Sequence, residues 1–540
     1  MKNNNILLSL RNLATSAVRR HATLLVAVLC LGVTFSSCRK DPIPGNGDNG
    51  DKTEQELVNE WTYDVLKFYY LWNEEVQNTV PTTYDVDYQT FLNNYLSGLT
   101  TNTLDGKTSS GSSRSLYSYI SRYEVSRASS TFEPTYGFDF TAYAFNIRNK
   151  DNQTELRYFA RIHYVTPDSP AANAGLKRGD WIGQIDGKKL TAANFNDINK
   201  LFAQNTVSVK ILKCEFTANE TGTGITFSED DADQTITLTR AAVEQNPIFC
   251  YRTFDADDGS KIGYLCFNAF KRGIDETDTD NHTEYEEQLR EVFRGFRNEG
   301  VSHLVLDLRY NPGGYVVTCQ LLSSMIAPES VLGTRFLECR PNSSRRSSYY
   351  DLLKLSDVSD CNLNLNKLYV IATENSASAS ELVINNLRGV GVDVVHVGTT
   401  TVGKVVGMEI VDHKVNSNDE AVFGSYHYMM HPVSFRSYNA RGESDYENGL
   451  VPDILYDEYM NEQNLDWLNW GELGEPDEPM LALTLNIING RSTAATANAN
   501  ANASKIHAPI GTGFVDCRSS ITLPERFGGS IVRPNDNLTE

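Results

Sequence analysis

The residues best suited to chemistry lie in the segment 375–381, which reads Asn-Ser-Ala-Ser-Ala-Ser-Glu. The apolar run at 368–372 predicts a buried strand before it, and the apolar spacing at 382–387 predicts a helix after it. A serine held at this turn, Ser378, can act as a nucleophile. Its hydroxyl attacks at neutral pH only if a neighbouring base takes the proton, so the segment needs a partner.

Lys404 is the best candidate for that base. It lies 26 residues after Ser378 and follows a second apolar run at 392–398, so both residues can stand at neighbouring strand ends of one parallel sheet. A lysine serves as a base only when it is neutral, which requires burial to lower its pKa from about 10.4. The apolar side chains around it favour this, namely Val402, Val405 and Val406.

The same serine also fits a purely structural interpretation. Ser378 and Glu381 match the capping-box pattern that starts a helix. The two interpretations are compatible, because a helix N-terminus presents free N–H groups to a developing oxyanion. The natural donor is the backbone N–H of Ala379.

A third element follows the buried strand predicted at 304–308. That strand ends in Asn311-Pro312-Gly313-Gly314, and glycines at such a turn let the backbone approach a ligand closely. Taken alone, this pattern is equally typical of an ordinary strand-ending turn. Three such elements on successive strands are much less expected by chance.

These motifs resemble the C-terminal processing peptidases, or tail-specific proteases, of serine peptidase family S41. The resemblance rests on Leu-Asp-Leu-Arg-Tyr-Asn-Pro-Gly-Gly at 306–314, the serine segment at 375–381, Thr-Thr-Val-Gly-Lys at 400–404 and Gly-Leu-Val-Pro-Asp-Ile at 449–454. With the region described next, it covers roughly residues 55 to 490. It implies a crotonase-like α/β peptidase core.

The resemblance also implies residue roles. Ser378 would be the nucleophile, Lys404 its base, and backbone groups of Gly313 and Ala379 the oxyanion donors. The chain departs from the family pattern at Met408, where many members place a glutamine that contacts the lysine. What orients Lys404 is therefore left open, with Glu409 as one candidate.

Residues 129–243 are rich in predicted strands and resemble a PDZ domain. Tyr136, Gly137 and Phe138 would form the loop that grips a peptide carboxylate, and the Ser-Pro-Ala to Gly-Asp stretch at 169–180 would form a short helix and turn. The acidic insert at 215–233 is predicted to be an elongated hairpin. The alternative is a module that docks on the catalytic part without binding peptide.

A small helical domain is predicted at 53–128. Thr53 and Glu56 form a capping box before an amphipathic helix at 57–72, and a second helix is expected at 88–99. The Ser/Thr-rich stretch at 100–115 should be loop.

The peptidase core is predicted at 244–490, including a helix at 282–297. The remainder, 491–540, begins with low-complexity sequence and is expected to bury little. The fold class is therefore multidomain α+β: a peptidase core with a PDZ-like domain and a helical N-terminal domain.

The first 37 residues read as a secretory signal, with positive charges before a short apolar run. The signal ends at Phe35-Ser36-Ser37-Cys38, which resembles a bacterial lipobox, so Cys38 would carry a lipid. The alternative is an unmodified cysteine after a simple signal. Residues 38–52 would be a flexible tether. We therefore expect an exported lipoprotein of the bacterial cell envelope, periplasmic or attached to the outer membrane.

The composition excludes several classes of function. A net charge of −21 and a pI near 4.9 argue against nucleic acid as a partner. No zinc spacing is present, and His427 and His431 are expected to lie in strands, so neither a metal nor a cofactor is predicted. Cys339 and Cys361 flank a polar segment and could form a disulfide.

Together the sequence predicts an exported serine endopeptidase that recognises exposed C-termini of protein substrates and cleaves through an acyl-enzyme. A histidine-based hydrolase is the first alternative, with His427, His431 or another histidine as the base in place of Lys404. The second alternative is a catalytically silent PDZ-type lipoprotein that only binds peptides.

Overall fold

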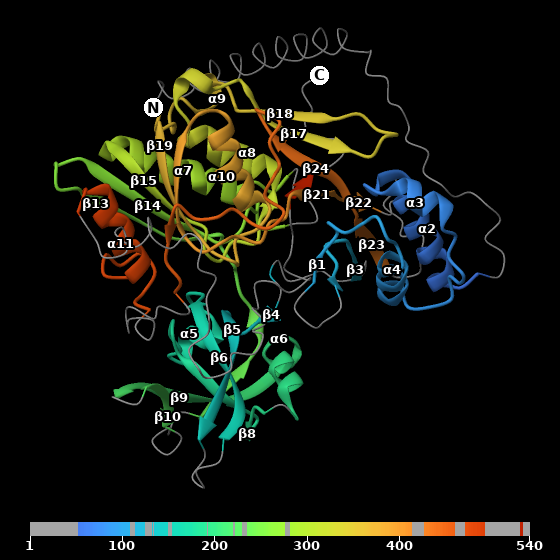
Figure 1. Cartoon of the computed structure of the whole chain (residues 1–540), viewed down its shortest axis with the longest axis horizontal. Coiled ribbons are helices and arrows are strands. Elements are labelled where there is room, and N and C mark those ends of the chain that lie inside the picture. The colour runs from blue at the N-terminus through green and yellow to red at the C-terminus, as the bar shows by residue number, and fades with distance from the viewer. Residues whose placement is uncertain are drawn as a thin grey trace, which may run out of the picture. The chain divides into compact units, whose positions relative to one another are not determined.

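The computed structural model of the chain describes residues 52–108, 114–124, 132, 134–148, 154–191, 193–219, 222–228, 235–275, 281–412, 426–458, 470–491 and 530–532. Figure 1 shows their helices and strands in chain order. The predicted signal at 1–37, Cys38 and the tether up to residue 51 lie outside the described residues.

The first described part begins with the expected helices. These are α2 (Glu54–Tyr69), α3 (Asn73–Asn78) and α4 (Tyr88–Ser97). The predicted capping box is present, since the Glu56 N–H donates to Thr53 Oγ1 at 3.2 Å and the Thr53 N–H donates to Glu56 Oε2 at 2.8 Å. The first helix has the predicted length but begins and ends three residues earlier, because the chain turns to extended backbone at Tyr70.

This part also contains strands, which corrects the prediction of a purely helical domain. The stretch at 100–115, expected to be loop, contains β1 (Lys107–Thr108) and β2 (Arg114–Ser115), which pair with each other. The next strand, β3 (Tyr119–Glu124), pairs with β23 (Tyr426–His431), which also pairs with β22 (Val411–Asp412). The N-terminal part therefore shares one hydrophobic cluster with strands from much later in the chain.

A seven-stranded sheet forms the PDZ-like part, in the order β10-β9-β7-β6-β5 with β8 and β11 paired at its side. The insert predicted as a hairpin is one, because β9 and β10 pair antiparallel around its turn. The module's helices are short. Its elements are β4 (Pro134–Thr135), β5 (Phe138–Arg148), β6 (Thr154–Val165), α5 (Pro170–Asn173), β7 (Trp181–Ile185), β8 (Lys188–Lys189), a 3-10 turn (Phe195–Asn199), α6 (Lys200–Ala203), β9 (Thr206–Asn219), β10 (Gly222–Ser228), β11 (Thr235–Thr239) and β12 (Ala241–Ala242).

The remaining part is built on a six-stranded sheet in the order β13-β14-β15-β19-β20-β25. From β14 to β25 the strands run parallel, so their carboxyl ends meet at one edge, where a binding site is favoured. The strands are β13 (Ile248–Asp255), β14 (Lys261–Phe267), β15 (Val301–Asp307), β19 (Lys367–Ala372), β20 (Asp393–Gly398) and β25 (Ile454–Leu455).

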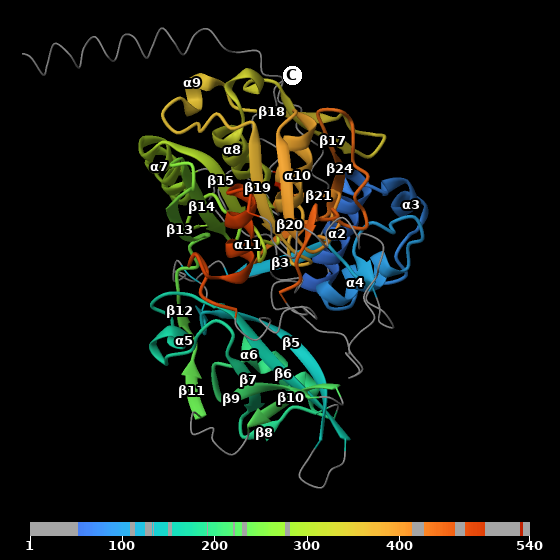
Figure 2. The ribbon, with the colours of Figure 1, turned by 60° about the vertical axis from the view of Figure 1, so that its left-hand side comes forward.

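Helices cover both faces of this sheet, and the alternation of strand residues explains how. Leu304, Leu306 and Val370 point into a core shared with α7 (Glu284–Glu299), α8 (Val316–Ile326) and α10 (Ala379–Gly389). Val305 and Ile371 point into a second core with α11 (Pro479–Ile488), which Figure 2 shows in red against the strands. The α/β core predicted from the sequence is therefore present. A short helix, α9 (Leu355–Val358), and a 3-10 turn (Glu329–Val331) complete it.

A second six-stranded sheet has the order β16-β26-β21-β24-β17-β18. One member, β26, comes from the tail that was expected to bury little, and it pairs on both sides. That expectation is therefore wrong for residues 530–532. The strands are β16 (Gly314–Tyr315), β17 (Arg335–Pro341), β18 (Ser348–Asp351), β21 (Val406–Glu409), β24 (Val433–Asn439) and β26 (Ser530–Val532).

The predicted disulfide is not formed. Cys339 and Cys361 are free thiols packed in the first core of the sheet. Burial raises the pKa of Cys361 to about 11 and that of Cys339 further still, so both thiols stay protonated and unreactive.

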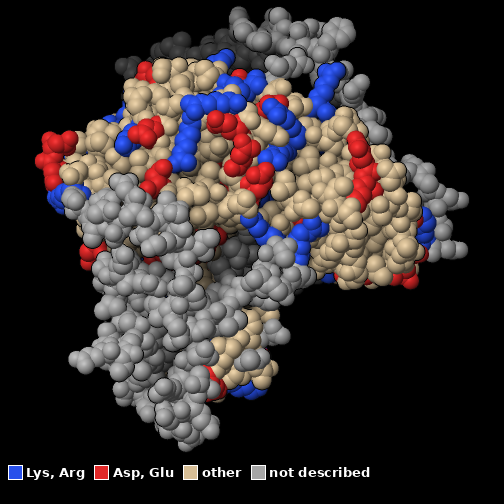
Figure 3. Space-filling view, in the orientation of Figure 1, with Lys and Arg blue, Asp and Glu red and all other residues tan. Residues whose placement is uncertain are grey.

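The surface drawn in Figure 3 is mixed in sign, with basic and acidic side chains close together in small groups. Such a face does not concentrate positive charge for a polyanion. Within the described ranges, no helix is long and apolar enough to cross a bilayer.

A buried ionic network lies beside the end of β15. The Arg309 guanidinium donates to Asp307 at 2.8 Å, to Glu478 at 2.7 Å and to Glu458 at 3.2 Å, and these side chains are at most 3 % exposed. Arg178 of the PDZ-like part shares Glu458 at 3.1 Å. Two cations thus compensate three carboxylates next to the strand that leads into Gly313, and Arg309 is the one that contacts all three.

We expect Arg309→Met to lower the free energy of unfolding by about 3–5 kcal/mol, because it leaves buried carboxylates without their cation. Arg294→Met is the matched control, since Arg294 pairs with Glu287 and Asp360 on the surface and its loss should leave the free energy of unfolding nearly unchanged. Urea unfolding compares the two. Equal losses would contradict the importance of this network.

Candidate active site

Ser378 stands at the junction of β19 and α10, immediately before the helix begins. Its backbone has φ 56° and ψ −110°, a conformation that a residue with a side chain rarely adopts. Strain of this kind persists only where the surroundings fix the backbone, and it is typical of functional sites. The residue is fully buried.

The Glu381 carboxylate fixes that backbone and the lysine loop at once. Its Oε2 accepts the Ser378 N–H at 2.7 Å and the Lys404 N–H at 2.9 Å. Its Oε1 accepts the Gly403 N–H at 2.5 Å and the Thr401 hydroxyl at 2.6 Å. One carboxylate therefore holds together two loops that are more than twenty residues apart in sequence.

Lys404 is enclosed in a nearly dry environment. Its side chain is 1 % exposed, and Nζ lies 4.5 Å from the centre of the Tyr117 ring, which belongs to the N-terminal part. Burial lowers the pKa of Lys404 to about 7, while the negative charges of Asp105 and Glu381 hold it up. A substantial fraction of the amine is therefore neutral near neutral pH.

Glu409, the candidate from the sequence, does not orient Lys404. Its carboxylate forms a two-pronged ion pair with Arg345, at 2.5 and 2.7 Å. That pairing satisfies the carboxylate in a different direction. Met408 is buried in β21.

Asp105 is the acidic group from the N-terminal part whose charge acts on the lysine. It is fully buried and accepts the backbone N–H groups of Tyr117 and Ser118 at 3.0 and 2.9 Å. It also accepts the hydroxyls of Tyr70 and Ser118, both at 2.7 Å. These bonds fix the segment that carries Tyr117 over the amine.

The Gly313 turn lies directly against the serine. A Cβ placed on Gly313 would come within 2.9 Å of the Ser378 Cβ and 3.1 Å of the Ala379 nitrogen, so no larger residue fits. The φ of Gly313 is 112°, which also requires glycine. The structure thus brings Ser378, Ala379 and Gly313 to one spot.

Asn311 anchors this turn on both sides. Its carbonyl accepts the Ala377 N–H at 3.1 Å and the Ser380 hydroxyl at 2.8 Å, and its side chain donates to the Phe267 carbonyl at 2.7 Å. Its Oδ1 accepts the Gly313 N–H at 2.9 Å. In this conformation a substrate oxygen would have to compete with Asn311 for that N–H group.

The predicted carboxylate loop lies at the start of β5, which is an edge strand of the PDZ-like sheet. Tyr136 and Phe138 point into the module's core, and the Tyr136 hydroxyl donates to the carbonyl of Gln204 after α6. The Gly137 N–H donates to Thr135 Oγ1 at 3.1 Å. The side chains therefore shape the loop, while only its backbone can face a ligand.

The two histidines of the alternative mechanism are engaged elsewhere. His431 stacks on Tyr119 with the ring centres 4.1 Å apart, and His427 lies 3.5 Å from Asp412. Both are in β23, as the sequence predicts. Within the part of the chain that the structure describes, no group of three His, Cys, Asp or Glu residues could hold a metal ion.

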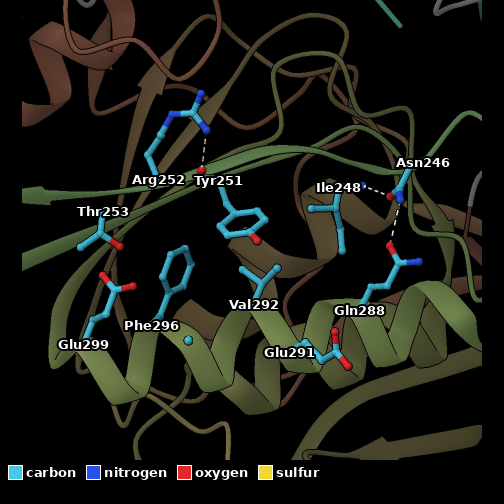
Figure 4. Close-up of a pocket in the computed structure, with 11 residues that line it drawn as sticks. Asn246, Ile248, Tyr251, Arg252, Thr253, Gln288, Glu291, Val292, Phe296 and Glu299 are labelled. Carbon is cyan, nitrogen blue, oxygen red and sulfur yellow. Dashed lines mark hydrogen bonds between the residues drawn. The ribbon is translucent and has the colours of Figure 1, made fainter. Parts of the chain in front are cut away.

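A hollow of about 580 Å³ lies elsewhere, between β13 and α7. Figure 4 shows the Tyr251 ring above Val292 and Phe296, with Asn246 donating to Gln288 at 2.8 Å. None of the residues predicted to act in catalysis lines it. The candidate site is thus a tightly packed junction of loops.

We expect Glu381→Gln to destabilise the chain by about 2–3 kcal/mol. Both carboxylate oxygens of Glu381 accept backbone N–H groups, so the NH2 group of glutamine would leave at least one of these N–H groups without an acceptor. Hydrogen exchange at Gly403 and Lys404 should accelerate with it. Glu338→Gln, at a surface pair with Arg340, is the control and should change neither quantity measurably. Unchanged exchange in Glu381→Gln would show that the carboxylate does not join the loops.

Three protein-family models match the chain. Residues 261–456 match "Peptidase family S41", residues 161–215 match "PDZ domain" and residues 58–119 match "Peptidase S41 N-terminal domain". The PDZ match does not include the loop at 136–138. The architecture expected from the sequence resemblance is therefore confirmed at the level of the family and its accompanying domains.

Individual proteins are similar over shorter stretches. The carboxy-terminal processing protease CtpB of Bacillus subtilis is 25 % identical over 265 residues, 48 % of this chain and 47 % of that protein. A carboxyl-terminal-processing protease of Picosynechococcus is 28 % identical over 148 residues, 27 % of this chain and 30 % of that protein. The chain thus spans about half, or less, of the curated relatives it matches here.

Among solved structures, a putative S41 protease from Bacteroides fragilis is similar over most of its length. The identity is 27 % and the TM-score 0.61, with 80 % of this chain and 98 % of that chain covered.

Proposed function

We propose that the chain hydrolyses peptide bonds in protein substrates, with Ser378 as nucleophile and Lys404 as base. The proposal starts from the membership of the chain in the serine-type peptidase family S41. One observation carries the proposal. A buried lysine with a pKa lowered to about 7 shares the Glu381 carboxylate with a serine in strained backbone. A structural lysine gains nothing from such burial, whereas a general base requires it.

The proposed reaction has two stages, formation of an acyl-enzyme and its hydrolysis. Lys404 Nζ accepts the hydroxyl proton as Ser378 Oγ adds to the carbonyl carbon. The backbone N–H of Ala379 stabilises the oxyanion, joined by that of Gly313 once the oxyanion displaces Asn311 Oδ1. The protonated amine then gives the proton to the leaving nitrogen, and the peptide bond breaks. Water, deprotonated by the same amine, hydrolyses the ester and restores Ser378.

We also propose that substrates are recognised through exposed C-termini. β5 is an edge strand, which an extended peptide can join, and its start carries the glycine loop. The names of the two relatives describe carboxy-terminal processing. A module that docks without binding peptide is the alternative, and the contacts of Arg178 with the core supply its support.

Export and lipid attachment are part of the same proposal and rest on the sequence alone. The signal-like segment at 1–37 and Cys38 place the enzyme on the cell envelope, tethered by a lipid. Envelope proteins with exposed tails would then be its substrates.

The test of catalysis uses an unfolded protein with an apolar C-terminus as substrate. We expect Ser378→Ala to abolish cleavage and Lys404→Met to lower kcat by about 10²–10⁴-fold. Both variants should still bind the substrate. Ser343→Ala, an exposed serine paired with Glu74, should cleave as the natural chain does. If Ser378→Ala cleaves normally, the nucleophile is wrong. If no variant cleaves and all bind, the peptide-binding alternative is correct.

The pH dependence tests the base independently. Since a base works when deprotonated, kcat/KM should rise through about pH 7 and level off above it. The Asp105 charge raises the pKa of Lys404, so Asp105→Asn should move the rise to lower pH. Asp64→Asn, which removes a surface partner of Lys67, should leave the profile in place. A profile that does not respond to Asp105→Asn would exclude Lys404 as the titrating group.

A further inference from the structure

A short segment of the chain lies between the two loops that form the candidate site. β26 pairs in parallel with β16, with Ser530 opposite Gly314 and Ile531 opposite Tyr315. On its other edge it pairs in parallel with β21. Its main chain is thus held from both sides.

The partners of β26 would form a slot without it. Neighbouring strands lie about 4.8 Å apart, so β16 and β21 are separated by about 10 Å, the width of one strand. Removing residues 530–532 would leave two unpaired strand edges facing each other. Such edges are a template for an extended peptide.

The two strands that border the slot, β16 and β21, also have contacts on the side away from β26. A Cβ on Gly407 would come within 2.0 Å of the Phe435 ring, because β21 packs closely on β24. The other strand, β16, is tied to Phe270, whose N–H donates to the Gly313 carbonyl at 2.9 Å and whose carbonyl accepts the Tyr315 N–H at 2.7 Å. These contacts do not involve β26, so the slot is formed independently of its occupant.

The slot opens at the candidate catalytic groups. β16 begins directly after Gly313, and β21 begins two residues after Lys404. Ser530 is opposite Gly314 on one side and Gly407 on the other, so the N-terminal end of β26 is the end nearest those groups. From there the segment runs away from the site toward its own C-terminus.

The direction defines which part of a substrate would fit. A substrate peptide that took the place of β26 would have its scissile bond on the N-terminal side of the residue that replaces Ser530. The slot would then hold the segment that leaves with the new amino terminus. For a substrate cleaved near its C-terminus, that segment is the released tail.

We propose that the slot between β16 and β21 binds the leaving segment of a peptide substrate as a parallel strand, and that residues 530–532 of the chain itself occupy it as a tethered competitor. The inference rests on the proposed peptidase function. A tethered occupant competes at a fixed, high local concentration, so substrate must displace it.

The experiment compares the full chain with a variant that ends at Gly529, both carrying Ser378→Ala. The probe is a fluorescent peptide with the sequence of residues 525–535. We expect the shortened variant to bind it at least tenfold more tightly, measured by fluorescence anisotropy. The same peptide with proline in place of Ile531 should not bind. Because β26 has a partner strand on each edge, the Ile531 N–H donates a hydrogen bond whichever edge it faces, and proline has no N–H to donate.

The activity of the natural sequence gives a second measurement. Removing residues 530–540, or introducing Ile531→Pro, should lower KM about tenfold with kcat unchanged, while Asn535→Pro, outside β26, should change neither. Tighter peptide binding by the shortened chain supports the proposal even if no variant cleaves, which separates it from the proposed function. Equal peptide binding by the full and the shortened chain would overturn it and leave β26 as a purely structural strand.

Discussion

The carboxylate of Glu381 is the interaction on which the site depends. It receives backbone N–H groups from both the serine and the lysine loops, and therefore sets the separation of the two loops. Burial raises the pKa of Glu381, while its four donors lower it. A carboxylate with so many charge-assisted bonds is rigid, and rigidity is what two short loops on adjacent strands lack by themselves.

The low pKa of Lys404 has a structural cost that the rest of the fold must offset. The sheet alone does not bury the amine. The N-terminal part completes the enclosure by placing Tyr117 and the Asp105 turn over it. This explains why that part shares its hydrophobic cluster with β21 and β23 instead of forming a separate core. The catalytic proposal thus gives a physical reason for an arrangement that stability alone does not require.

Local sequence signals were sufficient for much of this structure. Thr53 and Glu56 predicted the start of α2, and the apolar runs predicted the parallel strands that bring residues 313, 378 and 404 to one edge. The contacts that depend on distant partners could not be predicted. Glu381 was identified as a helix cap, but its bonds to Gly403 and Lys404 depend on tertiary packing. Nothing near Asp105 or Tyr117 in sequence indicates a lysine almost three hundred residues later. The partner of Glu409 could not be predicted either, because Arg345 lies 64 residues earlier in the chain. The three residues at 530–532 are too few for a periodic pattern.

The cover that Tyr117 and Asp105 place over Lys404 also bears on the chain before it has finished folding. With the first part undocked, the amine would be hydrated and would keep its proton at neutral pH. Newly made or partly unfolded copies would therefore be harmless to themselves and to their neighbours. Hydrolytic competence would therefore arise only once the tertiary structure is complete.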